Sequence, residues 1–512
     1  MAFFRQSFQR DTVSLAGLCV VVLTESIDAT SIAVALPTIA EAVSASTTAA
    51  YSLGTSFLVA LTLCQPVFAS GSDVFGRKPA LLCALVVFLA GAVVAAVSKN
   101  VAVLLLGRVL QGSGGAGVMV LAVIVLSDIF PLGERAKYVG VMNAVWAVGS
   151  VSGPVLGGAL AQVSWRWIFW INIPLVVLSI TSIAAFLPRR AADIPLWTKL
   201  GHIDYVGIVM FLTFGVSFFL PLVFAGIIRP WSSWEILVPL LVGIAGMVLF
   251  LGYEKKVAKE PMLRLAVFAN RTANVGQFGI FVHGVLLWTL VYYLPLYYEG
   301  VKGYSPLITG LAVFPETFTV APAAVVTGFY ISSTGQYRWA VWAGWFLTTL
   351  GYGLLCLLKP GTTVPSWIFL NLVAGLGVGM LVPALSITVQ AATQGTNVSH
   401  TISMYALVRA SGQACGVAIG TAIFQTQCKS VLAGMSGVNL TAEALIREIQ
   451  QFSGTPDQLD ELQEAVVRSV RIVWASGCAM AALAGVASIW IKPYALRSKP
   501  QAGEAGVETA AS

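Results

Sequence analysis

Long apolar segments separated by short polar loops run through almost the whole chain. Each segment is close to the length of about 20 residues that an α-helix needs to cross the hydrocarbon core of a bilayer. The pattern predicts about fourteen membrane-spanning helices, and the fold class is therefore all-α, a polytopic membrane protein. The expected spans are 13–36, 51–70, 80–98, 102–126, 138–161, 167–187, 205–226, 235–253, 274–297, 306–330, 339–358, 365–388, 403–426 and 472–491.

Three longer loops interrupt this rhythm and predict the domain organisation. Two of them, 188–204 and 254–273, are basic and flank the seventh and eighth spans, and the third, 427–471, is expected outside the membrane with an amphipathic helix near its middle. The predicted parts are an N-terminal six-helix bundle at 1–187, linkers with two additional transmembrane helices at 188–273, a C-terminal six-helix bundle at 274–491 and a cytoplasmic tail at 492–512.

Composition agrees with a membrane protein, and charge supplies its orientation. Charged residues make up 10% of the 512 residues and hydrophobic residues 57%, with a mean hydropathy of +0.85. Basic side chains concentrate in alternate short loops, which places both termini in the cytoplasm by the positive-inside rule. The net charge of +7 follows from this topology, and no further feature supports nucleic-acid binding. We expect a monomer in the bilayer of the plasma membrane, with a vacuolar or vesicle membrane as the alternative.

Ionisable side chains within the spans are candidates for chemistry. Glu25 and Asp28 lie three residues apart on one face of the first span, and Arg108 with Gln111 lies in the fourth. A charge at the bilayer centre costs at least about 2.5–3.5 kcal/mol, so it faces the bundle interior and needs a partner. Because the two spans are antiparallel, Asp28 and Arg108 are expected at similar depth.

A pair of this kind has two interpretations. If the distance from Asp28 to Arg108 or the access of water changes, the proton affinity of the carboxylate changes with it, as proton coupling requires. Alternatively, the pair only fixes the packing of the two helices. Glu25 is either a second proton site or a residue that faces water.

The fifth span carries a ladder of small residues interrupted by a proline. Small residues let membrane helices pack closely, and a proline removes a backbone hydrogen bond and leaves a hinge. Either property explains the ladder. Its members are Gly140, Gly149, Gly153, Pro154, Gly157 and Gly158.

Three sequence patterns, one in a loop and two in spans, together resemble the major facilitator superfamily. In the loop from Ala69 to Lys78, Asp73, Gly76, Arg77 and Lys78 stand in register with the family's cytoplasmic gate, whereas Ala69 and Gly71 depart from it. Arg108, Gln111 and Gly112 match the span-four motif that the family uses in proton transfer. The glycine ladder fits the antiporter motif, which is associated with export.

Further stretches resemble the fourteen-span drug:proton antiporters, and especially fungal members that export toxins and secondary metabolites. They are Asp28 to Thr30, Trp165 to Phe169, Ile171 to Pro174 and Tyr292 to Tyr297. The resemblance extends from about residue 13 to residue 491. It implies proton coupling through Asp28, Glu25 and Arg108, a cytoplasmic gate of Asp73, Gly76, Arg77, Lys78 and Arg135, and a hinge in the ladder.

The expected function is export of a small amphipathic organic compound by proton antiport with alternating access. A cavity between the two bundles would be lined by aromatic and amide side chains, although such aromatics also anchor helices at the membrane interface. The candidates are Gln111, Asn143, Trp146, Trp288, Tyr292, Gln390 and Gln413.

Two other functions remain open: proton-coupled uptake of a nutrient or chelate, and a transporter-like nutrient receptor. A receptor is expected to have a long signalling tail, and the chain after Trp490 is short. The sequence has no nucleotide-binding glycine loop, metal cluster or nucleophile elbow, so we expect neither an enzyme nor a cofactor. The seven cysteines are dispersed and predict neither a disulfide framework nor a metal site. Asn439 is the one sequon expected outside the cell and is the predicted glycosylation site.

Overall fold

The computed structural model describes residues 2–43, 47–187, 196–225, 229–304, 306–393, 398–432, 449 and 456–496. Within these ranges the chain is almost wholly helical, with no strand longer than an isolated bridge between Ala225 and Arg229. The prediction of an all-α fold is confirmed.

The helices follow one another with short connections. Thirteen helical segments have the length and hydropathy of a membrane span, and α13, with 19 residues, completes the fourteen expected from the sequence. The elements are α1 (Ala2–Ala42), α2 (Thr47–Phe75), α3 (Arg77–Ala96), α4 (Val101–Ile129), α5 (Leu132–Val163), α6 (Trp167–Trp170), α7 (Asn172–Phe186), α8 (Leu196–Gly201), α9 (Tyr205–Phe224), α10 (Trp234–Lys256), η1 (Leu265–Phe268), α11 (Arg271–Gly300), α12 (Pro306–Thr334), α13 (Tyr337–Leu355), α14 (Val364–Ala392), α15 (Val398–Leu432) and α17 (Pro456–Ser488).

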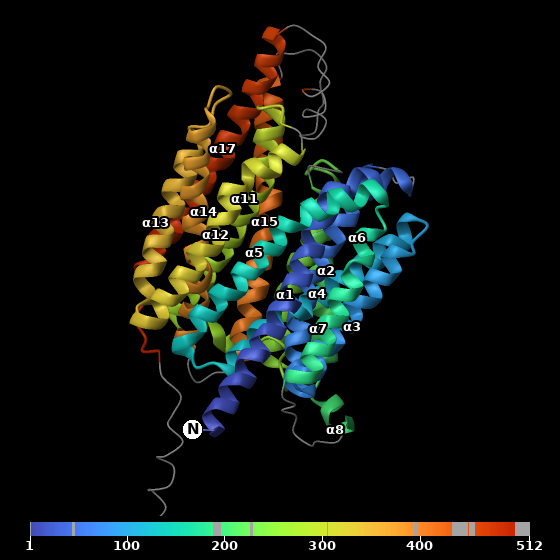
Figure 1. Ribbon diagram of the computed structural model, residues 1–512, viewed down its shortest axis with the longest axis vertical. Coiled ribbons are helices and arrows are strands. Elements are labelled where there is room, and N and C mark those ends of the chain that lie inside the picture. Colours follow the sequence, from blue (N-terminus) through green and yellow to red (C-terminus); the bar gives the residue numbers. More distant parts are fainter. Residues whose placement is uncertain are drawn as a thin grey trace, which may run out of the picture.

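The membrane helices form two bundles that stand side by side. Figure 1 shows α1 to α7 in blue to green on one side and α11 to α17 in yellow to red on the other. We call them the N-half and the C-half. The halves meet along two pairs of helices, because α5 packs on α12 and α2 packs on α15. Each half has its own large cluster of buried apolar side chains.

The two helices between the halves, α9 and α10, pack against each other and not as part of either bundle. α9 also contacts both α2 and α15. Phe211 and Phe219 of α9 share a buried cluster with Leu63 of α2 and Leu407 of α15. The linking pair therefore covers the seam between the halves on the α2–α15 side.

Several helix boundaries differ from the expected ones. The span expected at 167–187 is present as Trp167–Phe186. Only Ile171 separates its two helical parts, α6 and α7, since Pro174 has no N–H to bond the carbonyl of Trp170. α15 runs on to Leu432 and α17 begins at Pro456, so helix occupies both ends of the segment 427–471 that was expected to be a loop. The predicted helix near Glu443 lies outside the described residues apart from Ile449.

The basic loops gather at one end of the molecule, which we call the basic end. Here α2, α4 and α7 end and α3 and α5 begin, and Figure 1 shows the N-terminus and α8 at the same end. Gly76 forms the turn between α2 and α3 with a φ of 96°, which favours glycine. The positive-inside rule predicts that this end faces the cytoplasm.

Candidate functional site

Asp28 lies in a buried polar cluster that joins three helices of the N-half. Its side chain is 1% exposed, and Arg108 of α4 donates from Nη1 to Oδ2 at 3.0 Å. Gln111 donates to Oδ1 at 2.8 Å, and Asn172 of α7 donates to the same oxygen at 2.5 Å. The expected pairing of Asp28 with Arg108 is present. We call these four residues the Asp28 cluster.

Arg108 is held from two further directions. Its Nη1 also donates to Gln111 Oε1 at 3.0 Å, and its guanidinium lies 4.3 Å from the ring centre of Phe57 in α2. A buried ion pair is tolerated when further hydrogen bonds satisfy both partners, and the amides of Gln111 and Asn172 supply these bonds to Asp28. The cluster is therefore a hydrogen-bonded charge pair with both charges 1% exposed, in which Arg108 Nε and Asn172 Oδ1 are left without a hydrogen-bond partner.

Glu25 lies one turn from Asp28 on α1 and has a different environment. It is 3% exposed and accepts a hydrogen bond from Trp146 Nε1 of α5 at 3.2 Å. Among the described residues Glu25 forms no ion pair. The two carboxylates of the first span thus differ in kind: one is paired with a cation and the other is bonded to an indole.

The glycine ladder packs on the part of α1 that carries both carboxylates. A Cβ on Gly149 would lie 1.8 Å from Ser26 Oγ, and one on Gly153 would lie 2.0 Å from Thr30 Oγ1. A Cβ on Gly157 would lie 2.1 Å from the backbone oxygen of Ser31, which a rotamer change cannot relieve.

The other ladder residues have separate environments. Gly140 faces the C-half instead, where an added Cβ would lie 2.7 Å from the backbone oxygen of Ala324 in α12. Gly158 is half-buried, and α5 is a continuous helix through Pro154. Close packing therefore accounts for Gly149, Gly153 and Gly157, and the hinge stays a prediction.

At the basic end, side chains of the loop from Ala69 to Lys78 link the two halves. Asp73 pairs with Arg77 within the N-half and accepts a hydrogen bond from Ser399 Oγ of α15 at 3.2 Å. His400 Nε2 lies 3.8 Å from the same Asp73 oxygen. Arg77 also pairs with Asp128 of α4, at 2.9 Å from Nε to Oδ2. No motif in the sequence singles out Asp128 as a member of this contact.

Two other basic residues of the predicted gate have different partners. Arg135 of α5 donates to Gln390 Oε1 of α14 at 3.0 Å, and so bridges the halves. Lys78 donates to the carbonyl of Ala184 at 2.6 Å, which lies within the N-half. The halves are thus in polar contact at the basic end through Asp73 and Arg135.

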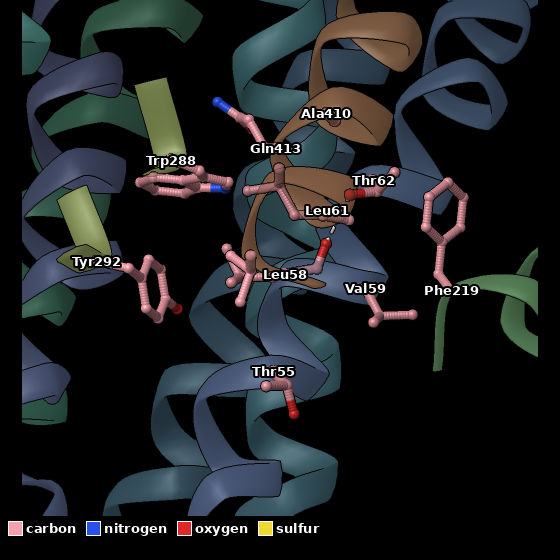
Figure 2. A pocket seen from close by; sticks show the side chains of 12 residues that line it. Thr55, Leu58, Val59, Leu61, Thr62, Phe219, Trp288, Tyr292, Ala410 and Gln413 are labelled. Atoms are coloured by element: carbon pink, nitrogen blue, oxygen red, sulfur yellow. Dashed lines mark hydrogen bonds between the residues drawn. The ribbon is translucent and has the colours of Figure 1, made fainter. Parts of the chain in front are cut away.

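A pocket lies between the halves, and Figure 2 shows side chains of four helices around it. Its empty volume of about 470 Å³ includes space that is open to solvent. Trp288 and Tyr292 of α11 form one wall, and Gln413 of α15 another. The remaining lining comes from α2, α9 and α15, and consists of Thr55, Leu58, Val59, Leu61, Thr62, Phe219, Ala410, Ala414 and Val417.

Only three of the seven predicted cavity residues, Trp288, Tyr292 and Gln413, line this pocket. The structure places the other four elsewhere. Gln111 belongs to the Asp28 cluster, and Gln390 is 5% exposed and bonded to Arg135 at the basic end. Trp146 bonds Glu25, and Asn143 donates to the carbonyl of Val139 in its own helix at 2.7 Å.

No metal centre was expected, and no group of three His, Cys, Asp or Glu side chains within the described ranges is placed to hold a metal ion. Asn439, the predicted glycosylation site, lies outside the described residues. The geometry is thus that of a helical membrane protein with a buried ion pair, a closed polar contact between the halves and a solvent-open pocket between them.

Relatives place these features in a known class of membrane protein. The chain is 42% identical over 494 residues to "MFS transporter L2" of Phoma sp. The aligned region covers 95% of this chain and 82% of the relative. It is 35% identical to "MFS-type efflux pump MMF1" of Mycosarcoma maydis over 81% of this chain and 68% of the relative. "Efflux pump FUS6" of Gibberella fujikuroi is 29% identical over 93% of this chain and 87% of its own length.

Solved structures share the fold at low sequence identity. The human organic anion transporter MFSD10 superposes with a TM-score of 0.60 at 16% identity, covering 94% of this chain and 99% of its own. The proton:xylose symporter XylE gives a TM-score of 0.58 at 13% identity, covering 92% and 96%. Fold and relatives together define a multi-pass membrane transporter. Residues 18–417 match the Major Facilitator Superfamily, and the chain belongs to that family.

Proposed function

We propose that this transporter exports a small amphipathic organic compound, such as a toxin, secondary metabolite or drug, in exchange for protons. Two of the relatives described above are named efflux pumps, which favours export over uptake. The observation that carries proton coupling is the Asp28 cluster, since it holds a carboxylate and an arginine in direct contact at 1% exposure.

Asp28 is the proposed proton carrier and Arg108 the group that sets its proton affinity. In the arrangement described here, Arg108 Nη1 lies 3.0 Å from Asp28 Oδ2 and the two side chains form an ion pair. A proton taken up on an Asp28 oxygen removes the negative charge and leaves Arg108 without its counter-charge. That change alters the packing energy of α1 against α4 and α7, and so couples protonation to the conformation of the N-half. Glu25 is a second proposed proton site.

The contacts at the basic end are the proposed cytoplasmic gate. Asp73 with Ser399 and Arg135 with Gln390 hold the halves together there, as an arrangement closed to the cytoplasm requires. Opening toward the cytoplasm breaks these bonds, and the halves rock along the α5–α12 and α2–α15 seams. The ladder of α5 is the proposed hinge, and the pocket of Trp288, Tyr292 and Gln413 the cargo site.

The test is efflux from proteoliposomes that contain the purified chain and a panel of labelled amphipathic toxins. An imposed proton gradient should drive export by the native chain and fail to drive it with Asp28→Asn. Asp460→Asn is the matched control, because Asp460 is an exposed carboxylate on α17 and should leave export unchanged.

Three outcomes contradict parts of the proposal. Export that persists after the gradient is collapsed removes proton coupling. Full gradient-driven export by Asp28→Asn moves the proton site to another residue. Accumulation of the compound down an inward proton gradient, in place of export, identifies a symporter for uptake.

A further inference from the structure

Arg409 of α15 is a cation inside the C-half that has no carboxylate partner among the described residues. Its side chain is half-buried, and its Nε is buried with no hydrogen-bond partner. No carboxylate of the described residues lies within ion-pairing distance of it, in contrast to Arg108, which has Asp28. Since a charged group within a membrane bundle needs a partner, Arg409 calls for an anion that the described chain does not provide.

The carboxylates inside the two halves have other partners. Asp28 is engaged by Arg108, Gln111 and Asn172. Glu25 is bonded to Trp146, and Glu316 of α12 accepts from Thr317 Oγ1 at 3.0 Å. Arg409 also interacts electrostatically with His283 of α11. A histidine side chain carries no negative charge and cannot neutralise an arginine, and His283 Nε2 bonds the carbonyl of Val378 at 3.1 Å.

Position on the helix connects Arg409 with the pocket. Arg409 is not itself a lining residue of the pocket, but Ala410 and Gln413 are. Residues four apart share one face of an α-helix, so Arg409 lies one turn before Gln413 on the same face. Opposite them stand the rings of Trp288 and Tyr292, which meet edge to face with centres 6.2 Å apart. Figure 2 shows these two rings and Gln413 around the same space.

We propose that the cargo of this transporter is an amphipathic organic acid whose carboxylate pairs with Arg409. Its apolar part lies against Trp288 and Tyr292, and the amide of Gln413 bonds a polar group between the two ends. This inference rests on the proposed export function and narrows its substrate class. An arginine recognises a carboxylate with two parallel N–H bonds, which makes Arg409 a specificity-determining residue.

The test measures equilibrium binding, which does not depend on a proton gradient. The purified full-length chain in detergent is titrated with N-dansyl-phenylalanine, a fluorescent aromatic acid, and separately with its neutral methyl ester. We expect the acid to bind at least about tenfold more tightly than the ester, as the loss of one charged hydrogen bond predicts. Arg409→Gln should abolish this preference, and Arg409→Lys should keep part of it.

Arg338→Gln is the control, because Arg338 of α13 also has a buried Nε without a partner but its guanidinium lies over Trp342. It should keep the full preference for the acid. The inference is overturned if the native chain binds acid and ester equally or binds neither, or if Arg409→Gln weakens both alike. Intact gradient-driven export with no acid preference contradicts this inference alone, whereas absence of export by the native chain contradicts the proposed function.

Discussion

The two halves use the same helix packing to surround very different interiors. In the N-half, glycines of α5 lie on α1, with Gly157 against the backbone oxygen of Ser31. In the C-half, glycines of α15 lie on α11 in the same manner: a Cβ on Gly412 would lie 2.2 Å from Phe281 O and one on Gly416 2.4 Å from Val285 O. Gly412 and Gly416 of α15 thus make the same kind of close helix contact as the glycines of α5.

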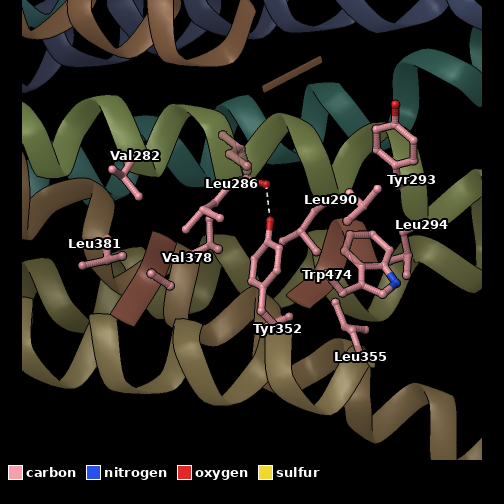
Figure 3. Close-up of a cluster of buried hydrophobic side chains, with 14 of the residues drawn as sticks. Val282, Leu286, Leu290, Tyr293, Leu294, Tyr352, Leu355, Val378, Leu381 and Trp474 are labelled. Carbon is pink, nitrogen blue, oxygen red and sulfur yellow. Dashed lines mark hydrogen bonds between the residues drawn. The ribbon is translucent and has the colours of Figure 1, made fainter. Parts of the chain in front are cut away.

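The interiors behind these contacts differ in polarity. Behind α1 lies the Asp28 cluster, whereas behind α11 the chain buries Leu290, Leu294 and Trp474. Figure 3 shows these side chains with Tyr352, whose hydroxyl donates to the backbone carbonyl of Leu286. The comparison indicates that close packing of the two helix pairs is independent of what they enclose. One half holds a buried charge pair, and the other has a large apolar cluster, a few buried polar side chains such as Glu316 and His283, and an arginine with no ion pair among the described residues.

The largest expected effect is on stability, and it distinguishes Arg108, which pairs with Asp28, from Arg409, which has no ion pair among the described residues. Arg108→Gln leaves Asp28 as an uncompensated buried charge and should lower the free energy of unfolding by about 3–5 kcal/mol. Arg409→Gln breaks no ion pair among the described residues and should change it by about 1 kcal/mol or less. Thermal unfolding in detergent, followed by tryptophan fluorescence, measures both.

A double variant makes this prediction sharper. Adding Asp28→Asn to Arg108→Gln removes the orphaned charge and should restore most of the lost stability. If the two arginine variants unfold alike, or if the double variant is no more stable than Arg108→Gln, the contrast between the halves is wrong.

The second effect tests whether the two glycine contacts are equivalent. Gly157→Ala and Gly416→Ala each place a methyl group against a backbone oxygen, at 2.1 Å and 2.4 Å. Each should cost about 1–3 kcal/mol of stability, since the helices must separate to admit it. Gly252→Ala on α10 is the control, because its Cβ meets no atom within 4 Å. A loss in only one half would break the packing analogy.

The smallest effect concerns the apolar interior. Tyr352→Phe removes the hydrogen bond to Leu286 O and should cost about 0.5–1.5 kcal/mol. The side chain lies in the C-half core, away from the Asp28 cluster and the pocket, so the proton-driven efflux rate should stay unchanged. A large loss of efflux at unchanged stability would instead assign this core a part in transport.

The hydrophobic pattern predicted the number of spans because fourteen apolar runs of membrane length are explicit in the sequence. It failed at the beginning of α17, where Asp457 and its acidic neighbours are polar enough to resemble a loop although they continue a helix.

Pairing was predictable only for residues that are costly to bury. Arg108 and Asp28 could be matched by depth, because each needs an opposite charge. Asn172 and Asp128 carry no such signal, since an amide or a carboxylate near a helix end has many possible partners. Gln390 was assigned to the cavity because of the span in which it lies. The helical period predicts which face of the helix a residue is on, but it does not predict which residue of another helix lies opposite. For Gln390 that residue is Arg135.

The position of α9 has a consequence for what lines the pocket between the halves. Phe219 of α9 forms part of the pocket wall, and α9 itself packs on both α2 and α15. With only the two six-helix halves, acyl chains of lipids would reach the pocket at this seam. In this structure Phe219 of α9 occupies that side of the pocket. If the pocket is the cargo site, we expect the lipid composition of the bilayer to have less influence on what it binds than in a transporter without the linking pair.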